Sequence, residues 1–572
     1  MFEINTEQAR DFIKDLGKLE SKRQPLEQVW QKIMEMIDPA NAFITKKYAA
    51  KKVWNERIYS TTAQRALPKF VAALQNTVTP NNQRWHRFTA PLNQLKDKQK
   101  ITSWLEKLTD AIFEMRYKPK AGFNKAIIKT WRGYGKLGVA TMFVDEDKDG
   151  DGATYEFVNI KDFYPVLYNN GTIKTCYRKI IKSAWEVCEE LKSKGINPEY
   201  VLPSEVWDKV KANKFTELKL IHVVCKMSKD EVESSKIVIK SADGTQIVTK
   251  YRYKSYLILN DINKPAVLEC GKFFTCPYMF TRYQELDYDI YSNSPSLEAL
   301  PDIKMLQRIR KSTIEAAEKA VDPPLLARND AAFGGLMPVA GAIMAGTLDN
   351  DGRELLKPLQ TGDNTRLGVE MEELFAKGIE DFFLTPLYMM YYQEGKMTAT
   401  EINQRAMERA MIMSINVFPI ENELLDPMVM RELDIMQRQG KLPEDMPDEL
   451  RQLMDMDLPY AAIQYEGEQH KAQELIKANG IATTMQAAVG LSSFDRHIAL
   501  AFKGYKCLTT IASANGMPAD HLLDEDDYTE LSEKQADAEN AAAQAAAIDS
   551  AAANVAGDVS ARYENRLASG NY

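Results

Sequence analysis

Apolar residues recur at helical spacing through the first 137 residues of the chain. Over residues 5–37 this spacing fits one long helix, which the Asp38-Pro39 pair ends because proline cannot continue a helix. Further helices are predicted over residues 59–78, 95–117 and 121–137. The N-terminal part of the chain is therefore predicted to be mostly helical.

The period of the pattern changes at about residue 138. The stretches VATMFVDED and TYEFVNI have the composition and alternation of strands, and an acidic loop separates them. Further short strand-like runs follow up to about residue 285, interrupted by one predicted helix at about 183–193. This middle region is predicted to be α+β.

Long helical patterns return at Leu300. Apolar residues keep helical spacing over 300–321, and Asp322-Pro323-Pro324 ends that helix. A second helix is predicted at about 364–384. A third is predicted from about Thr398 to Gln439, and the prolines inside it, Pro419 and Pro427, are expected to kink or split it.

The composition shifts near the C-terminus. Residues 524–531 are acidic, and alanine dominates from Ala536 to Ala561. Alanine favours a helix but leaves little surface to bury, so such a helix is marginal in isolation. Two alternatives stay open, a disordered tail and a helix that is ordered by packing against copies of itself.

The length and composition predict several folded domains. A chain of 572 residues with 45% hydrophobic and 27% charged residues is too long for one core. The net charge of −8 gives no sign of a free nucleic-acid binder, although a protein through which DNA only passes is not excluded. The six cysteines form no C-x-x-C pair, and no signal peptide is recognised, so reduced thiols in a cytoplasm are expected.

The segment of residues 331–348 is apolar and free of charge. Its four glycines and one proline disfavour a helix, so we interpret it as an apolar loop or extended segment rather than a membrane span. Exposed apolar surface of this kind usually marks a site for a partner. A membrane role is the minor alternative.

The stretch DEDKDGDGATYE, residues 145–156, matches a calcium-loop pattern through Asp145, Asp147, Asp149, Gly150 and Glu156. A calcium loop of this kind needs a helix on each side, whereas both flanks here are strand-like. An Asp- and Gly-rich turn between two strands is therefore the favoured interpretation, and a cation site is the alternative.

Signatures of enzymes are not recognised in the sequence. Its histidines lack the spacing of paired metal ligands, and no G-x-S-x-G motif occurs. The histidines are His86, His222, His470, His497 and His521. No catalytic residue, metal ligand or cofactor is therefore predicted.

The stretch PLYMMYYQEGKMTATE, residues 386–401, places bulky side chains between two long helices. Thr398 and Glu401 have the spacing of a capping box, which predicts the start of the next helix. From the residues alone, two readings stay open: a connection packed on its own core, and an exposed loop that touches something passing by.

Several motifs in order resemble the head-to-tail connector, or portal, proteins of short-tailed bacteriophages. They are TPNNQRWHRF (79–88), LGVATMFVDED (137–147), GKFFTCPYMFTRYQE (271–285), SPSLEALPDIKMLQRIRKSTIEAAEKAVDPPLL (294–326), MTATEINQR (397–405), QGKLPEDMP (439–447) and IQYEGEQHKAQ (463–473). The chain departs from the family at Ser292, where glycine is usual, and in its alanine-rich tail.

The resemblance implies a mainly helical α+β protein with the architecture of a portal. The implied parts are a wing (1–299, with N-terminal helices to 137), a stem of two helices (300–321 and 363–384), a clip (322–362), a tunnel loop (385–397), a long kinked helix (398–458), a crown (459–535) and an alanine-rich tail that could form a barrel (536–572). Such subunits assemble in the host cytoplasm, typically twelve together, into a ring at one capsid vertex of the virion.

The resemblance also implies partners and sites. The partners are copies of the chain, the terminase large subunit, a tail adaptor, the major capsid and scaffolding proteins, and double-stranded DNA that passes through without sequence-specific contacts. The implied tunnel-loop residues are Tyr388, Met389, Met390, Tyr391, Tyr392, Gln393 and Lys396. The implied clip residues for partner docking are Phe333, Leu336, Met337, Val339, Ile343 and Met344.

The charges of the two stem helices differ. Residues 301–321 carry five basic and three acidic side chains, and residues 364–384 carry two basic and five acidic ones. An acidic lumen repels phosphates rather than holding them, so we expect Glu370, Glu373 and Glu380 to line the channel, unless the crown does. Basic residues are expected nearer the outer stem or in pairs between subunits; they are Lys304, Arg308, Arg310 and Lys311.

The alternative to a portal is an internal virion or scaffold-type structural protein without a DNA channel. A calcium-regulated enzyme is a third class, which the lack of a recognisable nucleophile or metal cluster in the sequence disfavours.

Overall fold

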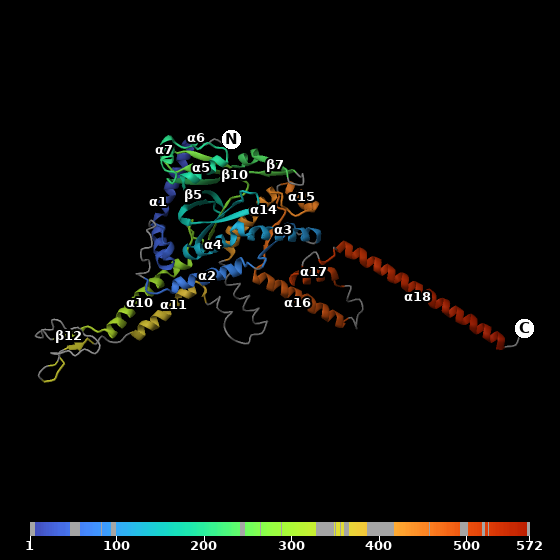
Figure 1. Ribbon diagram of the computed structural model, residues 1–572. Helices are drawn as coiled ribbons and strands as arrows, with labels where there is room; N and C mark the ends of the chain where they lie inside the picture. Colours follow the sequence, from blue (N-terminus) through green and yellow to red (C-terminus); the bar gives the residue numbers. More distant parts are fainter. Residues whose placement is uncertain are drawn as a thin grey trace. The chain divides into compact units, whose positions relative to one another are not determined.

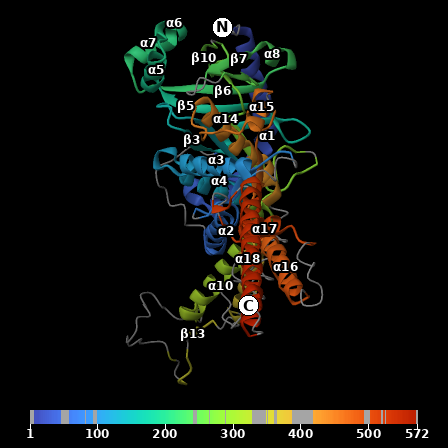
Figure 2. The same cartoon turned by 90° about the vertical axis from the view of Figure 1, so that its right-hand side faces the viewer.

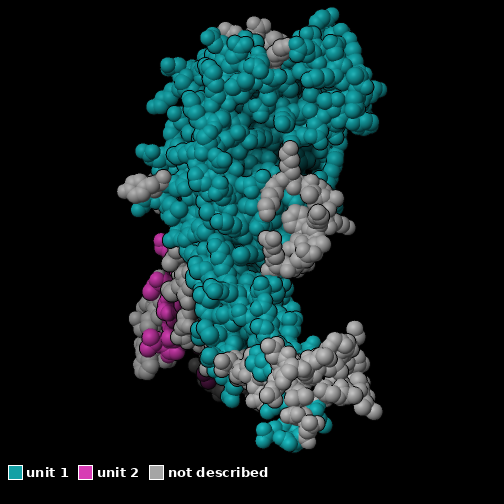
Figure 3. Space-filling model, turned by 90° about the vertical axis from the view of Figure 1, so that its left-hand side faces the viewer, with its two compact units in different colours: residues 1–85, 112–442 teal, residues 86–111, 443–572 magenta. Residues whose placement is uncertain are grey.

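The structure is a computed structural model, and it describes most of the chain in two compact units. The described residues are 6–45, 58–81, 83–92, 99–240, 246–263, 265–287, 289–327, 348, 351–354, 356–359, 365–385, 417–456, 458–491, 501–517, 521–523 and 525–568. The first unit comprises residues 1–85 and 112–442, and the second comprises 86–111 and 443–572 (Figure 3). Each unit is described separately below.

Three amphipathic helices form the N-terminal helical part of the first unit. They are α1 (Thr6–Ile37), α2 (Thr62–Val78) and α4 (Phe123–Leu137), with short turns η1 (Pro39–Asn41) and η3 (Pro119–Ala121). Each buries one apolar stripe, as the spacing along the sequence predicts. Helix α1 ends at Ile37, directly before Asp38-Pro39, so its predicted end is confirmed.

Two antiparallel sheets form the α+β part of the first unit. The smaller has the order β11 (Tyr278–Arg282), β2 (Val139–Glu146), β3 (Ala153–Val158). The larger has the order β10 (Val267–Phe273), β9 (Tyr253–Leu259), β6 (Glu217–Lys226), β5 (Ile173–Ser183), β4 (Phe163–Leu167). A separate pair joins β7 (Lys236–Lys240) to β8 (Gln246–Lys250). The predicted change from helices to strands near residue 138 is confirmed.

Side chains alternate between the two faces of the larger sheet, and helices cover parts of both. Ala9, Ile13 and Leu16 of α1 pack with Ile221 and Tyr256 on one face. The insertion between β5 and β6 packs a second cluster around Leu218, Leu220 and Leu259. This insertion contains α5 (Ala184–Ser193), α6 (Pro198–Val201) and α7 (Ser204–Ala212); α8 (Lys229–Ser234) follows β6. The short turn η4 (Ile160–Asp162) precedes β4.

A helical hairpin extends from this unit (Figure 1). After the short α9 (Pro295–Glu298), α10 (Leu300–Val321) and α11 (Thr365–Phe382) run side by side in opposite directions. Short strands β12 (Leu325–Ala327) and β13 (Leu356–Pro358) pair beyond α10. The predicted ends of α10 and α11 agree with the structure to within about two residues.

The long helix predicted to bend at two prolines contains a π-helical turn between them. Residues 417–438 are helical throughout, with η6 (Glu421–Leu425) before α14 (Asp426–Arg438). The N–H of Asp426 donates to the carbonyl of Glu421, five residues back. Because Pro427 has no N–H and its ring crowds the preceding turn, this widened turn accommodates it without ending the helix.

The second unit is mostly helical. Strand β1 (His86–Thr89) pairs with β14 (Ala462–Tyr465), and α3 (Gln99–Tyr117) begins in this unit. The other helices are α15 (Asp448–Asp455), α16 (Glu468–Leu491), α17 (Gly504–Ala514) and α18 (Glu525–Ala568), which are shown in Figure 2. Of the helices that the structure describes, none is long and apolar enough to span a membrane.

Candidate functional site

The acidic loop that matches the calcium pattern is a turn between strands β2 and β3. Asp145 pairs with Thr154 and Glu146 with Ala153 in the ladder, so the predicted turn is confirmed. Lys120 forms ion pairs with Asp147, at 2.9 Å, and with Asp149. Cations of the chain therefore already contact these carboxylates.

A third carboxylate of this loop is also paired. Asp151 lies 3.0 Å from Lys118 and 2.9 Å from Lys441, and their hydrogen bonds lower its pKa to about 2. Among the described residues, no group of three or more His, Cys, Asp or Glu side chains is arranged to hold a metal ion. The loop thus links α14's C-terminal end to the β2–β3 hairpin.

A buried ionic cluster fixes α14 more firmly. Arg116 of α3 donates to Glu432 of α14 through Nε at 2.9 Å and through Nη2 at 2.5 Å. The hydroxyl of Tyr155 donates to the same carboxylate. Both charged side chains are completely buried, and the guanidinium lies 4.5 Å from the ring centre of Trp85. Burial lowers the pKa of Arg116, but the charge and hydrogen bonds of Glu432, together with smaller contributions from Tyr155 and Tyr117, raise it overall.

Two further arginines tie the returning helix to the sheets. Arg282 of β11 pairs with Glu423 in the π-helical turn, and its backbone N–H donates to the same carboxylate at 2.8 Å. Arg431 of α14 lies 3.2 Å from Asp145. These contacts hold the helix to both the smaller sheet and α3.

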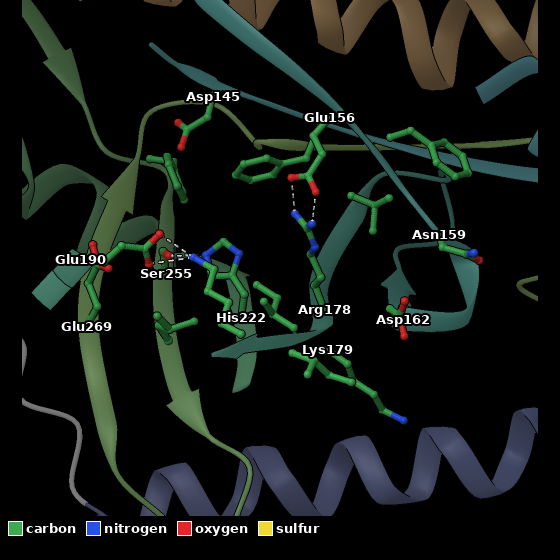
Figure 4. A pocket seen from close by; sticks show the side chains of 18 of the residues that line it. Asp145, Glu156, Asn159, Asp162, Arg178, Lys179, Glu190, His222, Ser255 and Glu269 are labelled. Carbon is green, nitrogen blue, oxygen red and sulfur yellow. Dashed lines mark hydrogen bonds and ion pairs between the residues drawn. The ribbon is translucent and has the colours of Figure 1, made fainter. Parts of the chain in front are cut away.

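A groove of about 1080 Å³ lies beside the larger sheet (Figure 4). Three of the five basic side chains that line it pair with acidic residues of the same groove: Arg178 with Glu156, Lys182 with Glu190 at 2.7 Å, and Lys194 with Glu269 at 2.6 Å. Because opposite charges in such pairs cancel, the net electrostatic potential of the groove is small, and it attracts neither a phosphate nor a metal ion strongly.

His222 lies in the wall of this groove. Its Nδ1 is 2.6 Å from the hydroxyl of Tyr278, and its Nε2 is 2.8 Å from Oγ of Ser255. Burial lowers the pKa of His222 to about 3, with a smaller contribution from Arg178. A histidine with so low a pKa is a weak base, so we assign this Ser–His–Tyr chain to the structure of the sheet rather than to catalysis.

The helical hairpin is the feature best placed to contact other molecules. At its base, Phe70 of α2 packs edge-on against Phe383, and Lys69 lies 3.1 Å from Glu380. Gln307 of α10 accepts hydrogen bonds from the backbone N–H groups of Tyr59 and Ser60. These contacts attach the hairpin to α2 and to the segment just before it.

Between the two helices, Arg310 forms an ion pair with the nearly buried Glu372. A Cβ on Gly368 would lie 2.6 Å from Oγ1 of Thr313, so the helices approach closely only because residue 368 has no side chain. Beyond this point α10 lacks cover, because every residue from Ile314 to Val321 is exposed.

The predicted channel residues lie on α11 with different surroundings. Glu370 is exposed and lies 3.4 Å from Arg366 on the same helix, and Glu373 is exposed as well. Glu380 is half-exposed and paired with Lys69. The structure places these three residues on one helix, but Glu380 belongs to the attachment of the hairpin.

The other predicted site residues lie outside the described residues. This applies to all seven of the tunnel-loop residues, Tyr388, Met389, Met390, Tyr391, Tyr392, Gln393 and Lys396. It also applies to the six clip residues, Phe333, Leu336, Met337, Val339, Ile343 and Met344. Their predicted roles stay predictions.

Neither the buried Arg116–Glu432 pair nor the Arg310–Glu372 pair could be recognised in the sequence. The first joins residues 316 positions apart. The second could have been inferred from the opposite charges of two antiparallel helices, but only once their register was known.

Comparison with known proteins identifies the family. The sequence model described as "Bacteriophage head to tail connecting protein" matches residues 9–523. The chain belongs to this family.

Two relatives match over nearly all of the chain. A protein of Bordetella phage BPP-1 named "Probable portal protein" is 21% identical over 566 residues and covers 96% of each chain. The "Portal protein" of Salmonella phage epsilon15 is 21% identical over 555 residues, which is 96% of this chain and 94% of the relative. A solved chain titled "Virion of native gene transfer agent (GTA) particle" covers 72% of this chain at 11% identity, with a TM-score of 0.29 that is too low to carry an argument.

Proposed function

We propose that this head-to-tail connecting protein is a portal subunit that assembles into a ring, typically of twelve copies, at one capsid vertex. The ring conducts double-stranded DNA during packaging and ejection, and it docks the terminase large subunit and later a tail adaptor. The observation that carries the proposal is the family match over residues 9–523, together with relatives named as portal proteins.

The helical hairpin supports the proposal independently. Two helices that project with apolar side chains in solvent cannot bury enough surface alone, so they need neighbours. Leu367 is 58% exposed and Leu374 is 68% exposed. In the proposed ring, α10 and α11 form the stem, the first unit's helices and sheets form the wing, and residues 322–362 form the clip.

Charge supports a role for the stem in guiding DNA. Twelve copies of a chain with net charge −8 carry roughly −96 in total, and an acidic channel lets phosphates slide without holding them. We assign Glu370 and Glu373 to the lumen, and residues 385–397 to the loop nearest the DNA. Substitution of Tyr391, Tyr392 and Lys396 by alanine should leave assembly intact and change DNA retention.

The C-terminal helix α18 also suits a ring. Apolar side chains that the structure describes on this helix are exposed, among them Leu531 at 52%, Ile548 at 68% and Val559 at 54%. Because its many alanines allow helices to approach closely, we assign α18 to a barrel of helices formed by the copies together, beyond a crown built by the rest of the second unit.

Electron microscopy of the purified protein tests the proposal. Class averages with rotational symmetry, close to twelvefold, and a central channel that admits a DNA duplex are expected. A monodisperse monomer at high concentration would contradict the proposal. A closed assembly without a channel would instead support the scaffold-type alternative.

A further inference from the structure

One side of α11 is apolar and has no cover among the described residues. The helix turns Gly368, Glu372 and Ile379 toward α10 or into the core. Leu367, Met371 and Leu374 follow helical spacing about a quarter turn away from that side, and Phe382 continues the line. These four residues are here called the lateral stripe.

The lateral stripe is open along its whole length. Leu367 is 58% exposed, Met371 40%, Leu374 68% and Phe382 36%. Single exposed apolar residues are common, but four in one line on a projecting helix form a continuous surface of the kind that binds another protein.

The charges around the stripe indicate what covers it. Glu370 and Asp381 border the stripe on the side away from α10 by helical spacing, and α11 as a whole is acidic. Helix α10 presents exposed Lys304, Arg308 and Lys311 and has a surplus of positive charge. Each chain therefore carries two complementary surfaces on one hairpin.

We propose that the lateral stripe is covered by α10 of a second copy of this chain, with Asp381 opposite that copy's Lys304. The inference rests on the proposed ring and names the surface that joins its subunits. Because one surface of each copy meets a different surface of the next, the contact is heterologous. Repetition of such a contact closes a ring of copies and does not form a twofold dimer. The methylene stems of that copy's basic side chains cover the apolar stripe, while the ammonium group of Lys304 reaches the carboxylate of Asp381.

The test uses the full-length protein and native mass spectrometry at a concentration at which the wild type is fully assembled. Leu374→Asp places a charge in the centre of the stripe, and at least a tenfold loss of the assembled species is expected. Phe215→Asp is the matched control, because Phe215 is 79% exposed in a loop of the same unit but lies outside the hairpin, and it should assemble normally. Circular dichroism and the unfolding midpoint confirm that both variants are folded, which is expected because both side chains are largely exposed.

A charge exchange tests which surface covers the stripe. Asp381→Lys and Lys304→Glu should each reduce the assembled fraction, and the double variant should recover at least half of it. If Leu374→Asp assembles like the wild type, or the double variant recovers no assembly, the inference is wrong, but the proposed ring is not contradicted. If the wild type itself does not assemble, the proposed function fails together with this inference.

Discussion

Arg116 and Glu432 lie 316 positions apart in the sequence and form a two-hydrogen-bond salt bridge in which both side chains are completely buried. Tyr155 donates to the same carboxylate, and the rings of Trp85 and Phe113 lie within 4.8 Å of the guanidinium carbon. The pair fixes the returning helix α14 to α3 and to the β2–β3 hairpin, and it is the most deeply buried ionic contact described above.

Removal of one charge from this pair should strongly destabilise the first unit. Glu432→Gln leaves the Arg116 guanidinium buried without an anion, which costs about 3–5 kcal/mol of the free energy of unfolding. Chemical unfolding, followed by circular dichroism at fixed protein concentration, measures the loss. Asp15→Asn is the control, because it breaks an exposed pair with Lys18 and should change little. A Glu432→Gln variant as stable as the control would show that the pair contributes little.

The stability of the sheet should fall in mild acid because of His222. Its pKa is about 3 in the folded state and about 6.5 in the unfolded chain, so the unfolded state binds the proton more tightly between these values. The contribution of neutral His222 to the free energy of unfolding is therefore fully present above about pH 6.5, and it is lost as the pH falls toward 3. At pH 5 the loss amounts to up to about 2 kcal/mol.

The variant His222→Gln isolates this effect. It removes the titrating group, so the difference in unfolding free energy between wild type and variant should shrink from pH 7 to pH 5. Carboxylates elsewhere titrate in both proteins and cancel in the comparison. A difference that is constant over this range would assign the acid sensitivity to other groups.

Calcium should not stabilise the protein through the acidic turn. Lys118, Lys120 and Lys441 already pair with Asp147, Asp149 and Asp151, and the flanking strands do not form the cage that an EF-hand supplies. Thermal unfolding with and without millimolar calcium should give the same midpoint. A rise in the midpoint that Asp147→Asn abolishes would restore the cation interpretation.

Gly138 should tolerate no side chain. Its φ is +70°, and a Cβ would lie 1.8 Å from the carbonyl oxygen of Asn293, which is a backbone atom that cannot rotate away. Gly195 has a similar φ of +75° but has open space around the same position. Gly195→Ala should therefore cost about 1–2 kcal/mol from the backbone alone, and Gly138→Ala about 3 kcal/mol or more.

Chemical unfolding of Gly138→Ala and Gly195→Ala separates the backbone strain of a positive φ from steric crowding by neighbouring atoms. The difference between their costs reports the close approach of α4 to the chain before α9. Equal costs would mean that the segment around Asn293 moves without penalty.

The ends of most helices could be predicted because they depend on local chemistry. Val321 ends α10 directly before Asp322-Pro323-Pro324, and Ile37 ends α1 before Asp38-Pro39. The start of α18 was less predictable: it begins at Glu525, within the acidic stretch, eleven residues before the alanines. Pairs such as Glu530 with Lys534 extend the helix into that stretch.

Contacts between distant parts of the chain could not be predicted. The place of Glu370, Glu373 and Glu380 on one helix followed from the helical pattern, but the pairing of Glu380 with Lys69 did not, since 311 positions separate them. The π-helical turn is an intermediate case. Pro419 and Pro427 predicted a disturbance, but the sequence did not show that a widened turn would keep the helix continuous.

The central claim is that copies of this chain surround a channel with α11 toward the lumen. A cryo-electron microscopy reconstruction of the purified assembly tests it most directly, because helices α10 and α11 can be traced relative to the symmetry axis. The account predicts a ring in which Glu370 and Glu373 face a DNA-wide channel and α10 of one copy covers Leu374 of the next. A ring with α10 at the lumen and Glu370 on the outer surface, or an assembly without a channel, would contradict it.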